Sequence, residues 1–394
     1  MTVEQIYGIM NDVTDEILGK DADGTGVNVI KEDLSNIVDI GNAIFDATSV
    51  ENATRTIMDK IGKVMFVIRP YNGSVPSVYR DAWEYGSVME KICGELPDAQ
   101  ENESWSLEDG ASYDQNVYYK PKVSEKFFNS KVTFEIPRSI ADEQVKSAFQ
   151  SGTQTNSFWS MLLNETQKSL SMKTDSLVMR TINNMIANTI NSEFTGGSGI
   201  SGHTGTKVVN LLYLFNQIGG TNYTYSQAKL MPEFIRFATY TMAIYKERLN
   251  KISRIFNIGG MARFTPNDMM HFVLLSDFAK ASEIYLQSTT YHNEMVKLRG
   301  FDSVPFWQGS GTSFADNDIT KINVTIKTAG GTQDVSTSGV IGVIFDHDAL
   351  GVTNLNQRTT SHYNAKGEFT NIWYKTDGSY FNDFNENCVV FVAV

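Results

Sequence analysis

The sequence has very few cysteines. Only Cys93 and Cys388 occur among 394 residues, far apart in the chain. This excludes a disulfide framework and a metal centre built from several thiolates. Two isolated cysteines in a chain of this length are typical of a protein that folds in a reducing compartment.

Long hydrophobic runs are also missing. The longest span residues 64–68 and 388–394, whereas a membrane-spanning helix needs about 20 apolar residues. The first basic residue is Lys20, which follows four acidic residues, and no apolar core precedes it. We therefore expect neither a signal peptide nor a membrane span.

Basic residues are in the minority. The chain has 33 Lys and Arg against 45 Asp and Glu, which gives a net charge of −12. Such a surface repels a phosphate backbone, so we expect any nucleic acid to be enclosed or touched locally, with few specific contacts. Hydrophobic residues at 41% indicate a globular chain, and its length predicts two or three domains.

The most informative stretch is residues 154–190, which contains no Gly or Pro. Apolar residues recur there every three or four positions, which predicts one helix of about 37 residues, whereas globular helices average about 11 or 12. The glycine-rich residues 196–205 then mark a domain boundary. Elsewhere the patterns predict helices at 2–18, 32–45, 207–218, 227–256 and 277–286, and strands at 64–68, 272–275, 319–327 and 340–345. The fold class is α+β.

Residues 79–137 have a different character. A strand-like segment at 87–92 leads into residues 95–114, which hold seven acidic residues and no basic one, and residues 117–136 return with four lysines. This predicts an extended two-stranded hairpin with an acidic tip and a basic return limb. Because such a hairpin buries little by itself, its stability has to come from packing on something else. The candidate contact residues for that packing are Glu101, Glu103, Glu108, Asp109, Lys120, Lys122 and Lys126.

Residues 21–32 follow the spacing of a calcium-binding loop. Asp21, Asp23 and Glu32 stand at loop positions 1, 3 and 12, Thr25 stands at position 5, and a glycine stands at position 6. Asn28 and Val29 depart from the pattern, and the chain has no second copy of the loop. Two interpretations stay open: a calcium site, which would make this a soluble calcium-binding protein, or an Asp- and Gly-rich turn.

Two further motifs suggest chemistry only weakly. Residues 196–207 are rich in glycine, but Thr206 separates the last glycine from Lys207, which breaks the spacing of a phosphate-binding loop. His347 lies between two aspartates and is the one candidate for a hydrolase. We interpret the first as a linker and the second as structural, and we expect no catalytic residue and no cofactor.

Several motifs resemble those of one protein family. Near the N-terminus they are Ile68-Arg69-Pro70-Tyr71, Trp83, Gly86 and Lys91-Ile92; near the C-terminus they are Asp346-His347-Asp348-Ala349-Leu350-Gly351-Val352, Asn364-Ala365-Lys366-Gly367-Glu368-Phe369, Asn371-Ile372-Trp373-Tyr374-Lys375 and Asn385-Glu386-Asn387. These motifs, and the order of the predicted elements, resemble the major capsid proteins of tailed bacteriophages that infect Gram-positive hosts.

The resemblance implies the tailed-phage capsid fold in five segments. They are an N-terminal arm (1–78), an extended hairpin loop (79–137), a peripheral domain with a long spine helix (138–195), an axial domain (196–350) and a return to the peripheral domain (351–394). The implied function is a shell subunit that assembles with itself into hexamers and pentamers around double-stranded DNA. The hairpin loop is then expected to lie on a neighbouring subunit, with the seven contact residues above as intersubunit contacts. Scaffolding, portal and decoration proteins are further implied partners, and the implied location is the virion, after assembly in the host cytoplasm.

Overall fold

The computed structural model describes residues 3–19, 42–44, 47–48, 56, 78–80, 89–94, 106–111, 116–120, 123–148, 152–287, 300–308, 319–328 and 330–394. Its helices are α1 (Val3–Leu18), α4 (Asp142–Ala148), α5 (Gly152–Glu193), η3 (Thr195–Gly197), α6 (Leu211–Gly219), α7 (Tyr225–Ala228), α8 (Pro232–Leu249) and α9 (Ser276–Gln287). Its strands are β1 (Tyr79–Arg80), β2 (Met89–Gly94), β3 (Val123–Phe128), β4 (Lys131–Ala141), β5 (Val208–Asn210), β6 (Met270–Leu275), β7 (Phe301–Val304), β8 (Ile322–Thr328), β9 (Gly331–Thr337), β10 (Val340–Asp346), β11 (Leu350–Asn364), β12 (Phe369–Asn382) and β13 (Cys388–Val392).

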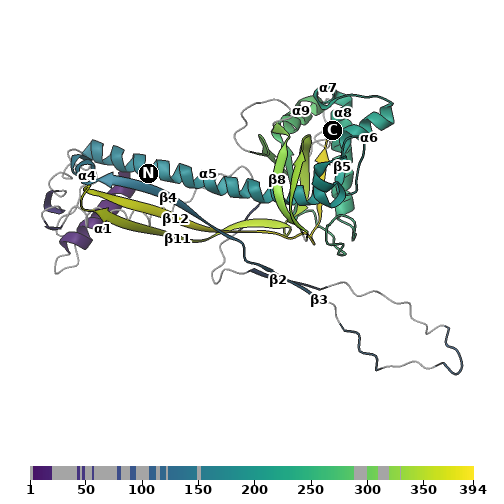
Figure 1. Ribbon diagram of the computed structural model, residues 1–394, viewed down its shortest axis with the longest axis horizontal. Coiled ribbons are helices and arrows are strands. Elements are labelled where there is room, and N and C mark those ends of the chain that lie inside the picture. Colours follow the sequence, from purple (N-terminus) through teal and green to yellow (C-terminus); the bar gives the residue numbers. More distant parts are fainter. Residues whose placement is uncertain are drawn as a thin grey trace.

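An elongated four-stranded sheet forms one half of the molecule. Its strand order is β1-β11-β12-β4, and the long strands β11 and β12 pair antiparallel along almost their whole length. Helix α5 runs beside this sheet and continues into the other half (Figure 1). Its 42 residues confirm the long helix predicted from residues 154–190. Two polar residues of α5, Thr181 and Thr189, are buried. Their hydroxyls stay hydrogen-bonded, because each donates to the carbonyl oxygen four residues earlier.

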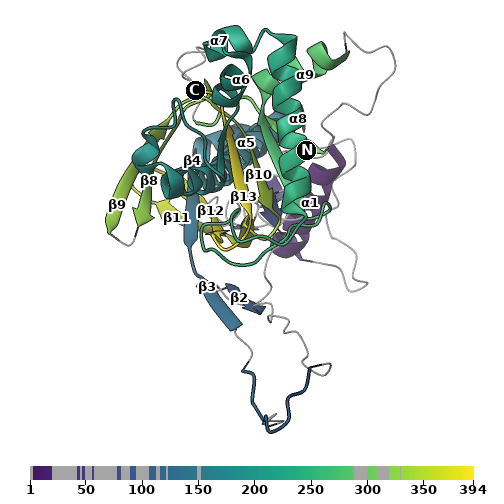
Figure 2. The ribbon, with the colours of Figure 1, turned by 90° about the vertical axis from the view of Figure 1, so that its right-hand side faces the viewer.

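The other half is built on a sheet with the order β5-β13-β10-β6-β7. All residues of β10 and β13 are buried, so both strands read as continuous apolar runs. Val343 and Val390 pack on the side of α5, whereas Ile344 and Phe391 pack on the side of α6, α8 and α9. Figure 2 shows α6, α8 and α9 beside this sheet. The strands predicted at 272–275 and 340–345 are the core of β6 and β10.

The segment 351–394 is divided between the two sheets. Strands β11 and β12 belong to the four-stranded sheet, but β13 lies between β5 and β10 in the five-stranded sheet. The helix predicted at 207–218 begins later than expected, because Val208–Asn210 form β5, which pairs parallel with Val390–Val392 of β13. The Asn210 side chain then accepts a hydrogen bond from the Tyr213 N–H and caps α6.

At the N-terminus, α1 confirms the helix predicted at 2–18, and it contacts α5. Most of the second predicted helix (32–45) and the strand predicted at 64–68 lie outside the described residues. Among the described helices, none combines the length and the apolar character that crossing a membrane requires.

Candidate subunit interface

Strands β2 and β3 form a short antiparallel ribbon that points away from both large sheets (Figures 1 and 2). The sequence predicted a single hairpin over residues 79–137, but the structure divides this segment. Its first strand, β1, pairs with β11, and its last, β4, pairs with β12. The ribbon itself is six residue pairs long, from Met89 opposite Phe128 to Gly94 opposite Val123. The hairpin therefore has a fixed root on the four-stranded sheet and a free end.

Large apolar side chains are exposed along this hairpin. Tyr118 is 82% exposed and Tyr119 is 73% exposed, and both lie in the part beyond the ribbon. The others are Ile92, Leu107, Val117, Val123 and Phe127. A gathering of exposed apolar residues on one projecting element is typical of protein–protein contact surfaces. A two-stranded ribbon is also marginally stable alone, so the same contact would stabilise it.

The root of the ribbon is held by ion pairs. Lys91 and Lys126 stand directly opposite each other on β2 and β3, which by itself is unfavourable. Both ammonium groups reach the carboxylate of Asp383, in the loop between β12 and β13, at 2.9 Å each. Lys91 also pairs with Glu386 at 2.8 Å and donates to the carbonyl oxygen of Asp348 at 3.2 Å. We call Lys91, Lys126, Asp383 and Glu386 the root cluster.

Burial and pairing set the ionisation of this cluster. The Asp383 side chain is 1% exposed. Burial alone would raise the pKa of its carboxyl, but the hydrogen bonds from Lys91 and Lys126 outweigh burial, so the pKa lies below its usual value. Burial would likewise lower the pKa of Lys91, yet the hydrogen bonds to Glu386 and Asp383 raise it. Asp383 and Lys91 are therefore both charged at neutral pH.

Two further contacts surround the root cluster. The Arg263 side chain lies 3.4 Å from the Glu386 carboxylate, and the rings of Phe128 and Phe381 pack with centroids 5.3 Å apart. Three of the resemblance motifs thus meet in space, since Lys91 contacts Asp348 of the segment 346–352 and Glu386 of the segment 385–387. Asp383 escaped the sequence analysis. Its only signal is its place beside Glu386 in a short loop before the apolar strand β13, which does not identify its partners.

The sequence-predicted contact residues fall into three groups. Glu108, Asp109 and Lys120 are exposed at the far part of the hairpin. Lys126 is in the root cluster, where its partner Asp383 belongs to the same chain. Glu101, Glu103 and Lys122 lie outside the described residues, as do Asp21, Asp23, Thr25 and Glu32 of the calcium-like loop.

The glycine-rich segment 196–207 ends in an anion-binding turn, but its anion is a side chain. The carboxylate of Glu193 accepts hydrogen bonds from the backbone N–H groups of Thr206, Lys207 and Val208 at 2.9–3.1 Å. The Lys207 ammonium lies 3.3 Å from the same carboxylate. Since Glu193 fills the position that a phosphate would take, this turn is structural, as the broken motif spacing indicated.

The candidate hydrolase histidine, His347, contacts a second histidine. The Nδ1 atom of His347 lies 2.8 Å from the Nε2 atom of His271 on β6. Asp346 accepts a hydrogen bond from the Asp348 N–H and so shapes the turn after β10. Within the described ranges, no three His, Cys, Asp or Glu side chains are grouped so that they could hold a metal ion.

The sequence matches the family described as Phi29-like phage major capsid protein over residues 11–392. It matches no curated protein. The capsid structure of Staphylococcus phage Andhra is similar with a TM-score of 0.52 at 10% identity, over 83% of this chain and 86% of that chain. The structure of the head fiber and inner core protein of bacteriophage P68 has a TM-score of 0.48 at 8% identity, over 82% and 85%. The capsid structure of Cyanophage P-SCSP1u has a TM-score of 0.43 at 11% identity, over 80% and 86%.

These similar proteins give no support to the calcium-binding alternative. The structural likeness to Staphylococcus phage Andhra extends over most of both chains and concerns the fold, which is that of tailed-phage capsid proteins. The family match spans nearly all of the sequence. The chain therefore belongs to the Phi29-like phage major capsid protein family, which confirms the resemblance found in its sequence.

Proposed function

We propose that the extended hairpin is the main contact between neighbouring subunits of the shell and that this chain acts through its interfaces, without a catalytic site. The observation that carries this is the row of exposed apolar side chains on an element that leaves its own body. Head-to-tail contacts of this kind join one surface to a different surface of the next copy, and they close into rings. The rings are the hexamers and pentamers of an icosahedral shell.

Four of the five segments expected from the sequence have matching roles in this proposal, whereas the last, 351–394, is shared between the two domains. The arm (1–78) and the hairpin loop (79–137) contact neighbours. The four-stranded sheet with α5 serves as the peripheral domain, and the five-stranded sheet with α6, α8 and α9 is the axial domain that converges at the centre of the ring. The net charge of −12 suits a shell that encloses double-stranded DNA without gripping it. Assembly takes place in the host cytoplasm, with scaffolding, portal and decoration proteins as further partners.

The test removes the exposed rings from the hairpin. The double variant Tyr118→Ser with Tyr119→Ser keeps the chain polar and unstrained, and its matched control is Tyr118→Phe with Tyr119→Phe. We expect the serine variant to need at least about tenfold more protein to assemble, because burial of an aromatic ring contributes more than 1 kcal/mol. Sedimentation velocity with negative-stain images measures this. Normal shells from the serine variant would contradict the proposal.

Charge on the return limb is tested separately with Lys120→Glu and Lys122→Glu. Lys126 is left unchanged, because reversing its charge would place a second carboxylate against the buried Asp383 and disturb the subunit itself. We expect slower assembly whose deficit shrinks at high salt, since exposed charges act mainly through screened attraction.

A further inference from the structure

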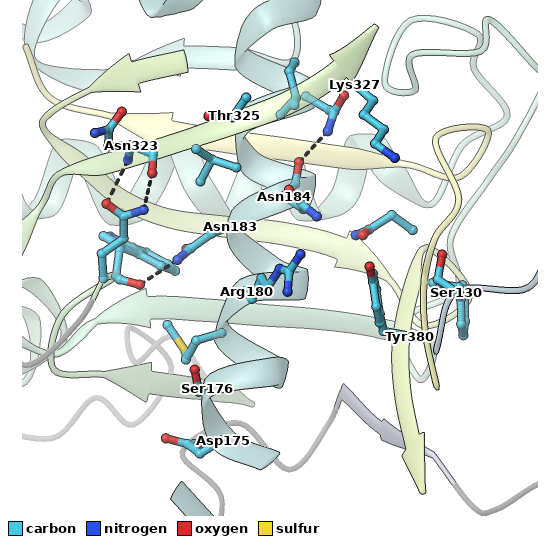
Figure 3. A pocket seen from close by; sticks show the side chains of 18 of the residues that line it. Ser130, Asp175, Ser176, Arg180, Asn183, Asn184, Asn323, Thr325, Lys327 and Tyr380 are labelled. Atoms are coloured by element: carbon cyan, nitrogen blue, oxygen red, sulfur yellow. Dashed lines mark hydrogen bonds between the residues drawn. The ribbon is translucent and has the colours of Figure 1, made fainter. Parts of the chain in front are cut away.

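A groove lies beside the C-terminal half of α5. It has a volume of about 980 Å³, and its walls come from α5, β8, β12 and residues 306–308. Figure 3 shows Asn183 and Arg180 of α5, Thr325 and Lys327 of β8, and Tyr380 of β12 around it. The groove mixes apolar rings with amide side chains, which is the composition of a peptide-binding surface.

The β8 wall is an open strand edge. The Gln308 side chain accepts from the Asn323 N–H at 2.9 Å and donates to the Asn323 carbonyl oxygen at 2.5 Å, so it stands where a third strand would lie. Backbone groups of alternate residues point the same way, so those of Thr325 and Lys327 face the groove as well. Among the described residues, no group outside the β8–β9 ribbon bonds to the backbone of Thr325 or Lys327.

The other edge of the same ribbon is covered. An added Cβ on Gly197 of η3 would lie 2.7 Å from the Ser336 carbonyl oxygen of β9, so η3 packs directly against that strand. Only the β8 edge, which faces the groove, is therefore open to an additional strand among the described parts of this ribbon. Open edges of this kind bind extended segments by backbone hydrogen bonds.

One buried polar atom of the groove lining has no hydrogen-bond partner among the described residues. Asn183 is 5% exposed; its amide nitrogen donates to the Trp307 carbonyl oxygen at 2.6 Å, but its Oδ1 atom has no hydrogen-bond partner. A buried acceptor without a donor is destabilising, because it has lost its hydrogen bond to water. A backbone N–H of a bound segment would satisfy it.

The charged side chains of the groove favour an acidic segment as its occupant. Arg180 and Lys327 are the cationic side chains of the groove, with Asp175 as its one carboxylate. Residues 95–114 of the hairpin carry seven acidic residues and no basic one. The described part of this acidic segment, 106–111, lies far from the body of its own chain (Figure 1), so it would fill the groove of another copy.

We infer that the groove between α5 and β8 receives the acidic hairpin segment of a second copy of this chain, which adds a strand to the β8 edge. This rests on the proposed function, because it presumes that the hairpin contacts a neighbour. It goes further by naming the surface that the hairpin meets: Thr325 and Lys327 supply backbone bonds, Asn183 an amide acceptor, and Arg180 a positive charge.

The first experiment identifies the occupant. Thr325→p-benzoylphenylalanine is introduced into isotopically labelled protein, which is assembled with an excess of unlabelled protein and irradiated. Mass spectrometry should find cross-links from residue 325 to unlabelled peptides within residues 95–122, whereas a probe on β9, Thr332→p-benzoylphenylalanine, should give none. Cross-links to another region, to another protein or to the hairpin of the same copy would overturn the inference, and so would the absence of any.

The second experiment removes one edge donor. Thr325→Pro deletes an N–H that points into the groove and spares the bonds to β9, whereas Thr325→Ala loses the same hydroxyl but keeps the N–H. We expect Thr325→Pro to raise the concentration needed for assembly about fivefold and Thr325→Ala to leave it unchanged. Equal behaviour of the two variants would refute the groove assignment. The hairpin proposal would still stand if the Tyr118 and Tyr119 double variant fails to assemble.

Discussion

Asp383 holds the hairpin root, so its neutralisation should loosen the ribbon. Asp383→Asn leaves Lys91 and Lys126 opposite each other without the carboxylate that both contact. Removing one partner of a fully buried ion pair typically destabilises by about 3–5 kcal/mol. The effect should be smaller here, because Lys126 is 34% exposed and Lys91 keeps Glu386. We expect about 2 kcal/mol, which corresponds to an opening of the root about 30-fold more frequent.

Hydrogen–deuterium exchange in unassembled subunits measures this opening. Peptides of β2 and β3 should exchange about 30-fold faster in the variant, while those of β10 and β13 should not change. The matched control is Asp377→Asn on β12, whose partner Arg358 is 44% exposed and whose loss should matter by less than about 1 kcal/mol. Unchanged protection of β2 and β3, or equal effects of the two variants, would refute the role assigned to the root cluster.

Three other outcomes follow from the same packing. Complete burial raises the pKa of the Cys388 thiol to about 12, so a thiol reagent should modify only Cys93 in the native subunit and both cysteines after denaturation. Trp307→Phe loses the indole donor to the Val340 carbonyl oxygen at 2.8 Å and leaves a cavity, so the free energy of unfolding from denaturant titration should fall by about 2–3 kcal/mol. Because the pKa of Asp383 is lowered in the folded subunit, the ionised carboxylate stabilises the fold at pH values above its unfolded pKa of 3.8, and this stabilisation is lost as the pH falls through the folded pKa. The difference in melting temperature between wild type and Asp383→Asn should therefore be present at neutral pH and vanish in strong acid.

The helices and strands whose conformation is determined by their own residues could be predicted from local sequence patterns. The absence of Gly and Pro from residues 154–190 predicted α5, and the apolar runs predicted β6 and β10. β5 was missed because Val208 and Val209 continue smoothly into a helical pattern. Their pairing with β13, some 180 residues later, decides their conformation.

In the hairpin too, some features follow from local residues and others from distant contacts. The acidic and basic limbs were visible in the sequence, but the length of the ribbon depends on where β4 joins β12. Lys126 was interpreted as a contact to a neighbour together with the other lysines of the return limb. The residues around it give no indication of its partner Asp383, which is more than 250 positions away. Glu193, likewise, meets the glycine-rich turn only through the geometry at the end of α5.

The place of β13 has a consequence for synthesis. This strand lies between β5 and β10, so the five-stranded sheet is incomplete until residues 388–392 have left the ribosome. Until then a nascent subunit has two unpaired strand edges and the apolar side chains that β13 covers, which invites pairing between chains on neighbouring ribosomes. Completion of this sheet therefore depends on one five-residue strand, because β13 pairs with both β5 and β10.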